Sequence, residues 1–131
     1  MTATATLAYL GDAVFELRVR EMLLARNPNG ASLWELNRQA RSYVNATAQA
    51  TMYHAIFNML MEDEQAVIKR GRNLHTTSRA KNADATAYRH ATGLEALFGY
   101  LYEKGDTNRL NTLFMQCTEA IQSQEAEERS N

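Results

Sequence analysis

Apolar residues recur at intervals of three and four positions along almost the whole chain, and this spacing constrains the fold more than any other feature. It places apolar side chains on one face of an α-helix, whereas a half-buried strand needs strict alternation. Helix breakers are rare, with one proline and six glycines among 131 residues. The sequence therefore predicts an all-α fold, and its length is sufficient for one domain with its own hydrophobic core.

Start and stop signals predict six helices. The first is expected over about 7–26 and ends at the turn-forming stretch NPNG. Ser32 and Asn45 are expected to cap the second and third helices, and Glu35 would complete a capping box with Ser32. Gly105 followed by Asp106 is typical of a helix end and a new N-cap. The remaining expected segments are a fourth helix over about 62–70, a loop over about 71–81 and a fifth helix over about 83–104.

One domain is expected over residues 1–122, followed by a polar tail, 123–131, that should fray. The formal net charge is −1, so any surface for nucleic acid must be local. The single cysteine, Cys117, excludes an internal disulfide and is expected to be a small buried residue. Neither a membrane span nor a secretory signal is predicted, and we expect a cytoplasmic protein.

Gly11 and Asp12 interrupt an otherwise regular amphipathic helix in the stretch LAYLGDAVFELRVREMLL. Both residues are poor helix formers, and glycine costs roughly 1 kcal/mol relative to alanine in a helix interior. Their position among apolar residues indicates a site kept for close packing or for chemistry.

A second unusual stretch, ATGLEALFGYLY, places Glu95 at the edge of an apolar face that contains several small residues. Close packing of the two helices could bring Asp12 and Glu95 to one divalent cation. Oxygen ligands of this kind suit Mg²⁺, which commonly binds through one or two carboxylates and keeps several waters. The residues alone leave an alternative, in which each carboxylate is satisfied by a helix cap or by a basic side chain.

Glu16 lies one helical turn after Asp12 and one turn before Arg20. It is either half of an ordinary ion pair with Arg20 or an auxiliary ligand beside Asp12. The three histidines, His54, His75 and His90, lack the spacing of metal ligands, and His54 and His90 are expected to help fill helix surfaces.

The segment KRGRNLHTTSRAK, residues 69–81, is basic, rich in hydroxyl groups and free of acidic residues. Phosphate contact needs such charges and hydrogen-bond donors, although a solvated loop would have the same composition. The candidate RNA-binding residues are Lys69, Arg70, Arg72, Asn73, Thr76, Thr77, Ser78, Arg79, Lys81 and Asn82.

Taken together, the stretches LAYLGDAVFEL, KRGRN with the following AKN, and YRHATGLEALFGYLY resemble the ribonuclease III catalytic domain. They are most similar to its short bacterial form, the Mini-ribonuclease III family, which has no separate domain for binding double-stranded RNA. The similarity extends from about Leu7 to Phe114, with the motifs in matching order and spacing.

This resemblance implies an all-helical homodimer that hydrolyses double-stranded RNA with Mg²⁺, for which Mn²⁺ can substitute, and leaves 5′-phosphate and 3′-hydroxyl ends. Asp12 matches the aspartate of the family's LGD motif and Glu95 the glutamate of its EAL motif. Both would be catalytic metal ligands. The short form is associated with maturation of the large-subunit (23S) ribosomal RNA precursor, and a ribosomal protein that presents the substrate is a candidate partner.

Two positions depart from the larger family. Ala8 stands where that family has a glutamate, and Thr92 stands where it has an aspartate; the short form shares both departures. We expect weaker metal binding than with four carboxylates, with water, Thr92 or Glu16 completing the ligand shell. The alternatives to an endoribonuclease are an inactive RNA-binding or ribosome-associated protein with the same fold, and a helical protein-interaction module.

Overall fold

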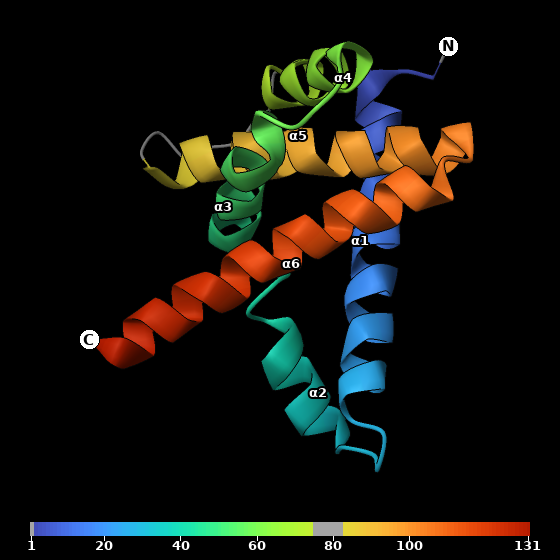
Figure 1. The fold of residues 1–131 in the computed structure, drawn as a ribbon. Coiled ribbons are helices and arrows are strands. Elements are labelled where there is room, and N and C mark those ends of the chain that lie inside the picture. Colours follow the sequence, from blue (N-terminus) through green and yellow to red (C-terminus); the bar gives the residue numbers. More distant parts are fainter. Residues whose placement is uncertain (1, 75–82) are drawn as a thin grey trace.

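The computed structural model describes residues 2–74 and 83–131, and every regular element in these ranges is an α-helix. Figure 1 shows α5 lying across α1, with α6 running diagonally from the end of α5 across α1, and α2 beside the C-terminal end of α1. The helices are α1 (Thr4–Arg26), α2 (Leu33–Ala40), α3 (Ala46–Phe57), α4 (Glu62–Arg72), α5 (Ala83–Lys104) and α6 (Thr107–Ser130). The predicted all-α fold is confirmed.

The core surrounds α5, whose residues Leu94, Leu97, Phe98 and Leu101 are fully buried. Phe98 contacts Phe15 of α1 at 5.6 Å between ring centroids, and Phe15 contacts Phe114 of α6 at 5.7 Å. Fully burying an aromatic or leucine side chain contributes roughly 1.5–3 kcal/mol, so this shared core fixes α1 and α6 against α5.

The helix starts follow the predicted capping residues. The Ser32 hydroxyl accepts from the Glu35 N–H at 3.1 Å, and the Asn45 side chain accepts from the Ala48 N–H at 2.8 Å. Asp106 caps α6 in the same way after Gly105, whose φ of 80° suits glycine. The expected capping box would also have the Glu35 carboxylate accept from the Ser32 N–H. Instead, this carboxylate accepts hydrogen bonds from the side chains of Arg38 and Gln39.

Two helices continue beyond the expected ends. The fourth ends at Arg72 rather than near residue 70, so Arg72, expected in the loop, lies with Lys69 and Arg70 on the last turn of α4. The tail over 123–131, expected to fray, continues α6 as far as Ser130 because its Gln, Glu, Ala and Arg residues are good helix formers. Thr76, Thr77, Ser78, Arg79, Lys81 and Asn82 lie outside the described residues.

The start of α4 is fixed by a buried ion pair. Both oxygens of Glu64 accept from the Arg109 guanidinium of α6, at 2.8 and 2.9 Å, and Arg109 also donates to the Met59 carbonyl. Burial alone would raise the pKa of Glu64, but the bonds from Arg109 and from the Met61 N–H hold it below its ordinary value. This pair connects α4 to α6. Within the described residues, no helix is both long enough and apolar enough to cross a membrane.

Glycines allow α1 and α5 to approach at backbone distance. A Cβ atom added to Gly11 would lie 1.6 Å from the Glu95 carbonyl oxygen, and one added to Gly99 would lie 1.9 Å from the Leu7 carbonyl oxygen. Gly71 of α4 and Gly93 of α5 form a similar crossing, where a Cβ on Gly71 would lie 2.8 Å from the Gly93 Cα. Close packing therefore accounts for the glycine inside the first helix.

Replacing Gly99 with alanine is expected to lower the free energy of unfolding by about 1–3 kcal/mol, because the new methyl group must push α1 away from α5. An unhindered glycine-to-alanine change in a helix would raise it by about 1 kcal/mol, so the sign separates the two cases. Urea unfolding measures the free energy of unfolding of Gly99→Ala and of a control variant, Asn111→Ala, on the exposed side of α6. A stabilised Gly99→Ala variant would contradict the close approach.

Candidate active site

Asp12 and Glu95 lie in one surface pocket, on α1 and α5 respectively, where the two helix backbones meet. Asp12 follows Gly11, and Gly11 packs directly against the backbone carbonyl of Glu95. The pocket has a volume of about 330 Å³, and we call it the carboxylate pocket. Its lining residues are Ala5, Ala8, Tyr9, Asp12, Leu74, Tyr88, Thr92 and Glu95. The structure thus brings together two side chains that are 83 positions apart in the sequence.

The two carboxylates perturb each other. Glu95 is half-buried, whereas Asp12 is exposed. Burial, together with the hydrogen bond and the negative charge of Asp12, raises the pKa of Glu95 from 4.5 to about 8. At neutral pH the Glu95 carboxyl group therefore holds a proton when no cation is present. A divalent cation placed between the two groups would remove this repulsion, which is the property expected of paired metal ligands.

Thr92 and Ala8 also line this pocket, at the two positions where the larger family has carboxylates. The Thr92 hydroxyl donates to the Tyr88 carbonyl at 3.0 Å, and Ala8 offers only a methyl group. Among the described residues, no group of three or more His, Cys, Asp or Glu side chains is close enough to share a metal ion. The protein ligands available here are therefore the two carboxylates, with Thr92 beside them.

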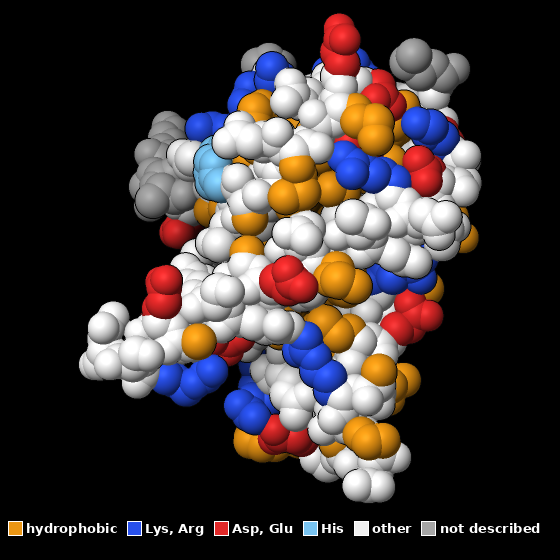
Figure 2. Space-filling view, viewed as in Figure 1, with side chains coloured by type: hydrophobic (Ala, Val, Ile, Leu, Met, Phe, Trp, Pro, Cys, Tyr) orange, Lys and Arg blue, Asp and Glu red, His pale blue; other side chains and the backbone are white. Residues whose placement is uncertain are grey.

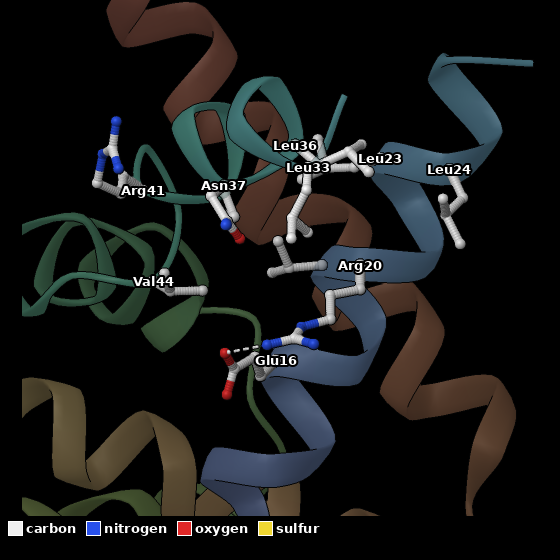
Figure 3. A pocket seen from close by; sticks show the side chains of 11 residues that line it. Glu16, Arg20, Leu23, Leu24, Leu33, Leu36, Asn37, Arg41 and Val44 are labelled. Atoms are coloured by element: carbon white, nitrogen blue, oxygen red, sulfur yellow. Dashed lines mark hydrogen bonds and ion pairs between the residues drawn. The ribbon is translucent and has the colours of Figure 1, made fainter. Parts of the chain in front are cut away.

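Glu16 lies apart from this pocket. Its carboxylate accepts from Arg20 at 3.1 Å, and both residues border a different, largely apolar cavity of about 460 Å³ between α1 and α2. Figure 3 shows the pair at one end of that cavity, with Leu23, Leu33 and Leu36 at the other. Of the two hypotheses for Glu16, the structure therefore supports the ion pair with Arg20. Glu16 does not line the pocket that holds Asp12 and Glu95.

The described basic candidates lie at the end of α4. Lys69 and Arg70 are exposed, and the Lys69 Nζ lies 5.7 Å from the centre of the Phe57 ring. Arg72 donates to the Tyr53 hydroxyl at 3.1 Å and to the Asn73 side chain at 3.2 Å. Leu74, two residues after α4, lines the carboxylate pocket. The basic end of α4 thus lies next to the paired carboxylates.

Sequence reasoning missed several residues around these sites. Tyr9 and Tyr88 border the carboxylate pocket, with 84% and 48% of their surface exposed. His54 and His90, expected to fill separate helix surfaces, meet with their ring centroids 4.6 Å apart. They come from α3 and α5, so no spacing in the sequence could have revealed the contact.

Comparison with known proteins identifies the family to which the chain belongs. A family model described as the Ribonuclease III domain matches residues 5–106. The chain is 44% identical to Mini-ribonuclease 3 of Symbiobacterium thermophilum over 89% of its length and 88% of that protein. It is 40% identical to Mini-ribonuclease 3 of Brevibacillus brevis, over 95% of this chain and 91% of that protein.

A crystal structure of a protein from Fusobacterium nucleatum has a similar fold, with a TM-score of 0.77 and 30% identity over 89% of this chain and 92% of that chain. The matched residues 5–106 include Asp12, Glu95 and all of α4. The resemblance inferred from the three sequence motifs is confirmed. The chain belongs to the ribonuclease III domain family, in its short Mini-ribonuclease 3 form, and is an endoribonuclease of the ribonuclease III type.

Proposed function

We propose that this endoribonuclease cleaves double-stranded RNA in a Mg²⁺-dependent reaction at the carboxylate pocket. The observation that carries the proposal is the pairing of Asp12 with Glu95, which the glycine contact between α1 and α5 holds in place. Two adjacent carboxylates facing an anionic substrate would repel it, so a cation between them is needed before RNA can bind there.

The residues present fit Mg²⁺. Asp12 and Glu95 supply carboxylate oxygens, and the exposure of Asp12 leaves room for water and phosphate ligands. Burial, together with the hydrogen bond and charge of Asp12, raises the pKa of Glu95, and a bound cation would favour its ionised form. When bound, Mg²⁺ supplies positive charge that lowers the pKa of water and stabilises charge developing on a phosphodiester. Hydrolysis at the bond between phosphorus and O3′ adds water, leaving a 5′-phosphate and a protonated 3′-hydroxyl.

Recognition of duplex RNA depends mainly on its shape and its phosphates and 2′-hydroxyl groups. The exposed side chains of Lys69 and Arg70 at the end of α4 support phosphate contact beside the carboxylate pocket. By resemblance to the short form, the natural substrate we propose is the large-subunit (23S) ribosomal RNA precursor in the cytoplasm, with a ribosomal protein as a candidate partner that presents it.

A homodimer is part of this proposal. Tyr9, Leu17 and Leu24 lie within about 80° of one another around α1, and each has more than half of its surface exposed. Leu33 of α2 is also exposed and lines the same apolar cavity as Leu24. Covering such a surface favours association, and the presence of Tyr9 on it would bring a second copy close to the carboxylate pocket.

Asp12→Asn and Glu95→Gln are each expected to slow cleavage by more than about a hundredfold, because each removes a charged ligand. The assay uses an end-labelled RNA duplex with Mg²⁺, and EDTA should abolish cleavage by the wild type. Glu16→Gln is the matched control on α1 and should cleave normally, since Glu16 pairs with Arg20. Unimpaired cleavage by either Asp12→Asn or Glu95→Gln would refute this site, and intact RNA with the wild type would refute the substrate.

Affinity for Mg²⁺ is expected to rise with pH up to about 8, because the metal must displace the proton held by Glu95. Calorimetric titration with Mg²⁺ should show binding at least about tenfold weaker at pH 6.5 than at pH 8.5. Glu95→Gln should bind weakly at both values and lose this pH dependence. Equal wild-type affinity at the two pH values would contradict the assignment of Glu95 as a ligand.

Leu17→Glu combined with Leu24→Glu is expected to yield monomers, because two charges would enter the apolar face of α1. Sedimentation velocity distinguishes the two states. Met115→Glu places a charge on an exposed residue of α6 and should leave the dimer intact. A wild-type chain that sediments as a monomer, or a double variant that remains dimeric, would exclude this face as the interface.

A further inference from the structure

A second polar pocket lies between α3, the end of α4 and α5, apart from the paired carboxylates. It has a volume of about 250 Å³, and we call it the histidine pocket. It is lined by Tyr53, His54, Phe57, Asn58, Arg72 and His90. Every polar member of this set can donate a hydrogen bond and none is acidic, which is the composition of an anion site.

Arg72 is held in place at this pocket. Its Nη1 donates to the hydroxyl of Tyr53, a residue only 2% exposed, at 3.1 Å, and its Nε donates to Asn73 at 3.2 Å. Among the described residues, no carboxylate lies within ion-pair distance of Arg72. Because a guanidinium has five N–H groups, the bonds to Tyr53 and Asn73 leave others available for an anion.

The histidines are held by ring contacts and by the backbone. The His90 ring lies 4.5 Å from that of Tyr53 and 4.6 Å from that of His54, measured between centroids. The Nδ1 atom of His90 lies 2.8 Å from the Thr86 carbonyl oxygen. Since a carbonyl oxygen only accepts, Nδ1 carries a proton, and Nε2 can donate to an anion only when the ring is protonated there as well.

Positive charge is concentrated around these rings. Burial lowers the pKa of His90, and the nearby His54, Arg72 and Arg89 lower it further. The hydrogen bond to the Thr86 carbonyl acts in the opposite direction but does not outweigh them. Lys69 adds a further cation over the Phe57 ring. The C-terminal ends of α3 and α4 each contribute about half a negative charge, which Lys69 alone would balance. Arg72 and Arg89 therefore leave net positive charge at this pocket, and Figure 2 shows histidine side chains exposed there with Lys and Arg side chains above them.

The position of the pocket connects it to the proposed substrate. Arg72 lines the histidine pocket and Leu74 lines the carboxylate pocket. These residues are two positions apart in the chain, so their Cα atoms lie at most about 7 Å from each other. The α5 helix also contributes to both, through His90 and Glu95. The two pockets thus flank the end of α4, within reach of one RNA molecule.

We propose that the histidine pocket binds a phosphate group of the RNA backbone away from the bond that is cut, with Arg72 as its principal ligand. The charge-assisted bonds of a fixed guanidinium suit phosphate, and the Tyr53 and Phe57 rings provide apolar walls for the attached ribose. The identity of the ligand as RNA depends on the function proposed above, whereas binding of phosphate does not.

The first test measures duplex RNA affinity against salt concentration in EDTA, so that no cleavage occurs. Arg72→Gln should reduce the slope of log affinity against log salt by about one, the change expected for one lost phosphate contact. Arg72→Lys keeps the charge and should retain most of the slope. Arg41→Gln, on an exposed residue after α2, is the matched control with an unchanged slope. Thermal unfolding confirms that each variant is folded.

The second test uses inorganic phosphate alone, at constant pH and ionic strength, with sodium chloride as the reference salt. Imidazole NMR signals of His54 and His90 should shift on titration of the wild type. Arg72→Gln should bind phosphate about tenfold more weakly, because a charged hydrogen-bond partner is lost. His54→Gln, at an exposed position, should weaken binding without affecting the fold.

A reduced slope together with phosphate-dependent shifts supports the proposal. Shifts without a reduced slope would overturn the assignment to RNA and identify a site for free phosphate. The absence of shifts would overturn the pocket itself, whatever the slope. A wild type that neither binds duplex RNA in EDTA nor cleaves it with Mg²⁺ would refute the proposed function, and the phosphate titration would still decide whether this pocket binds an anion.

Discussion

The contact between the backbones of α1 and α5 determines the rest of the site. Gly11 and Gly99 each lie where a side chain would overlap a carbonyl group of the opposite helix. Asp12 follows the first of these glycines, and Glu95 supplies the carbonyl that the first glycine touches. A larger separation between the helices would move one carboxylate away from the other, so the helix packing and the pairing of the two carboxylates have the same physical cause.

That contact has an energetic consequence for the folded chain. Glu95 is half-buried beside Asp12, so between its ordinary pKa of 4.5 and its raised pKa of about 8 the folded state holds a proton that the unfolded state has released. The unfolded state then binds fewer protons, and the stability of the metal-free chain falls as the pH rises through this range. A cation bound by both carboxylates would reverse this loss, which couples stability to metal binding.

Much of this arrangement could be predicted from local signals in the sequence. Ser32, Asn45 and Asp106 identified helix starts because a capping side chain acts on the backbone a few residues away. Asp12 and Glu95 stood out because each interrupts an apolar pattern. The pairing of His54 with His90 could not be predicted, since it depends on how α3 packs against α5. Local signals do not fix the end of α4, because Gly71 is a poor helix former, whereas in the structure it lies in the last turn of α4 and packs against Gly93 of α5.

Contacts at both ends of α4 explain how the residues at its C-terminal end can line two pockets. Its N-terminal turn is anchored to α6 by Glu64 and Arg109, and its C-terminal turn is pressed against α5 at Gly71 and Gly93. Fixed at both ends, α4 has little freedom to rotate or slide, so the residues on either side of its last turn keep their positions. Arg72 lines one pocket and Leu74 lines the other. A rigid helix end between a cationic pocket and a pair of carboxylates is suited to fixing an RNA strand relative to the bond that is cut, because the position of one phosphate restricts where its neighbours can lie.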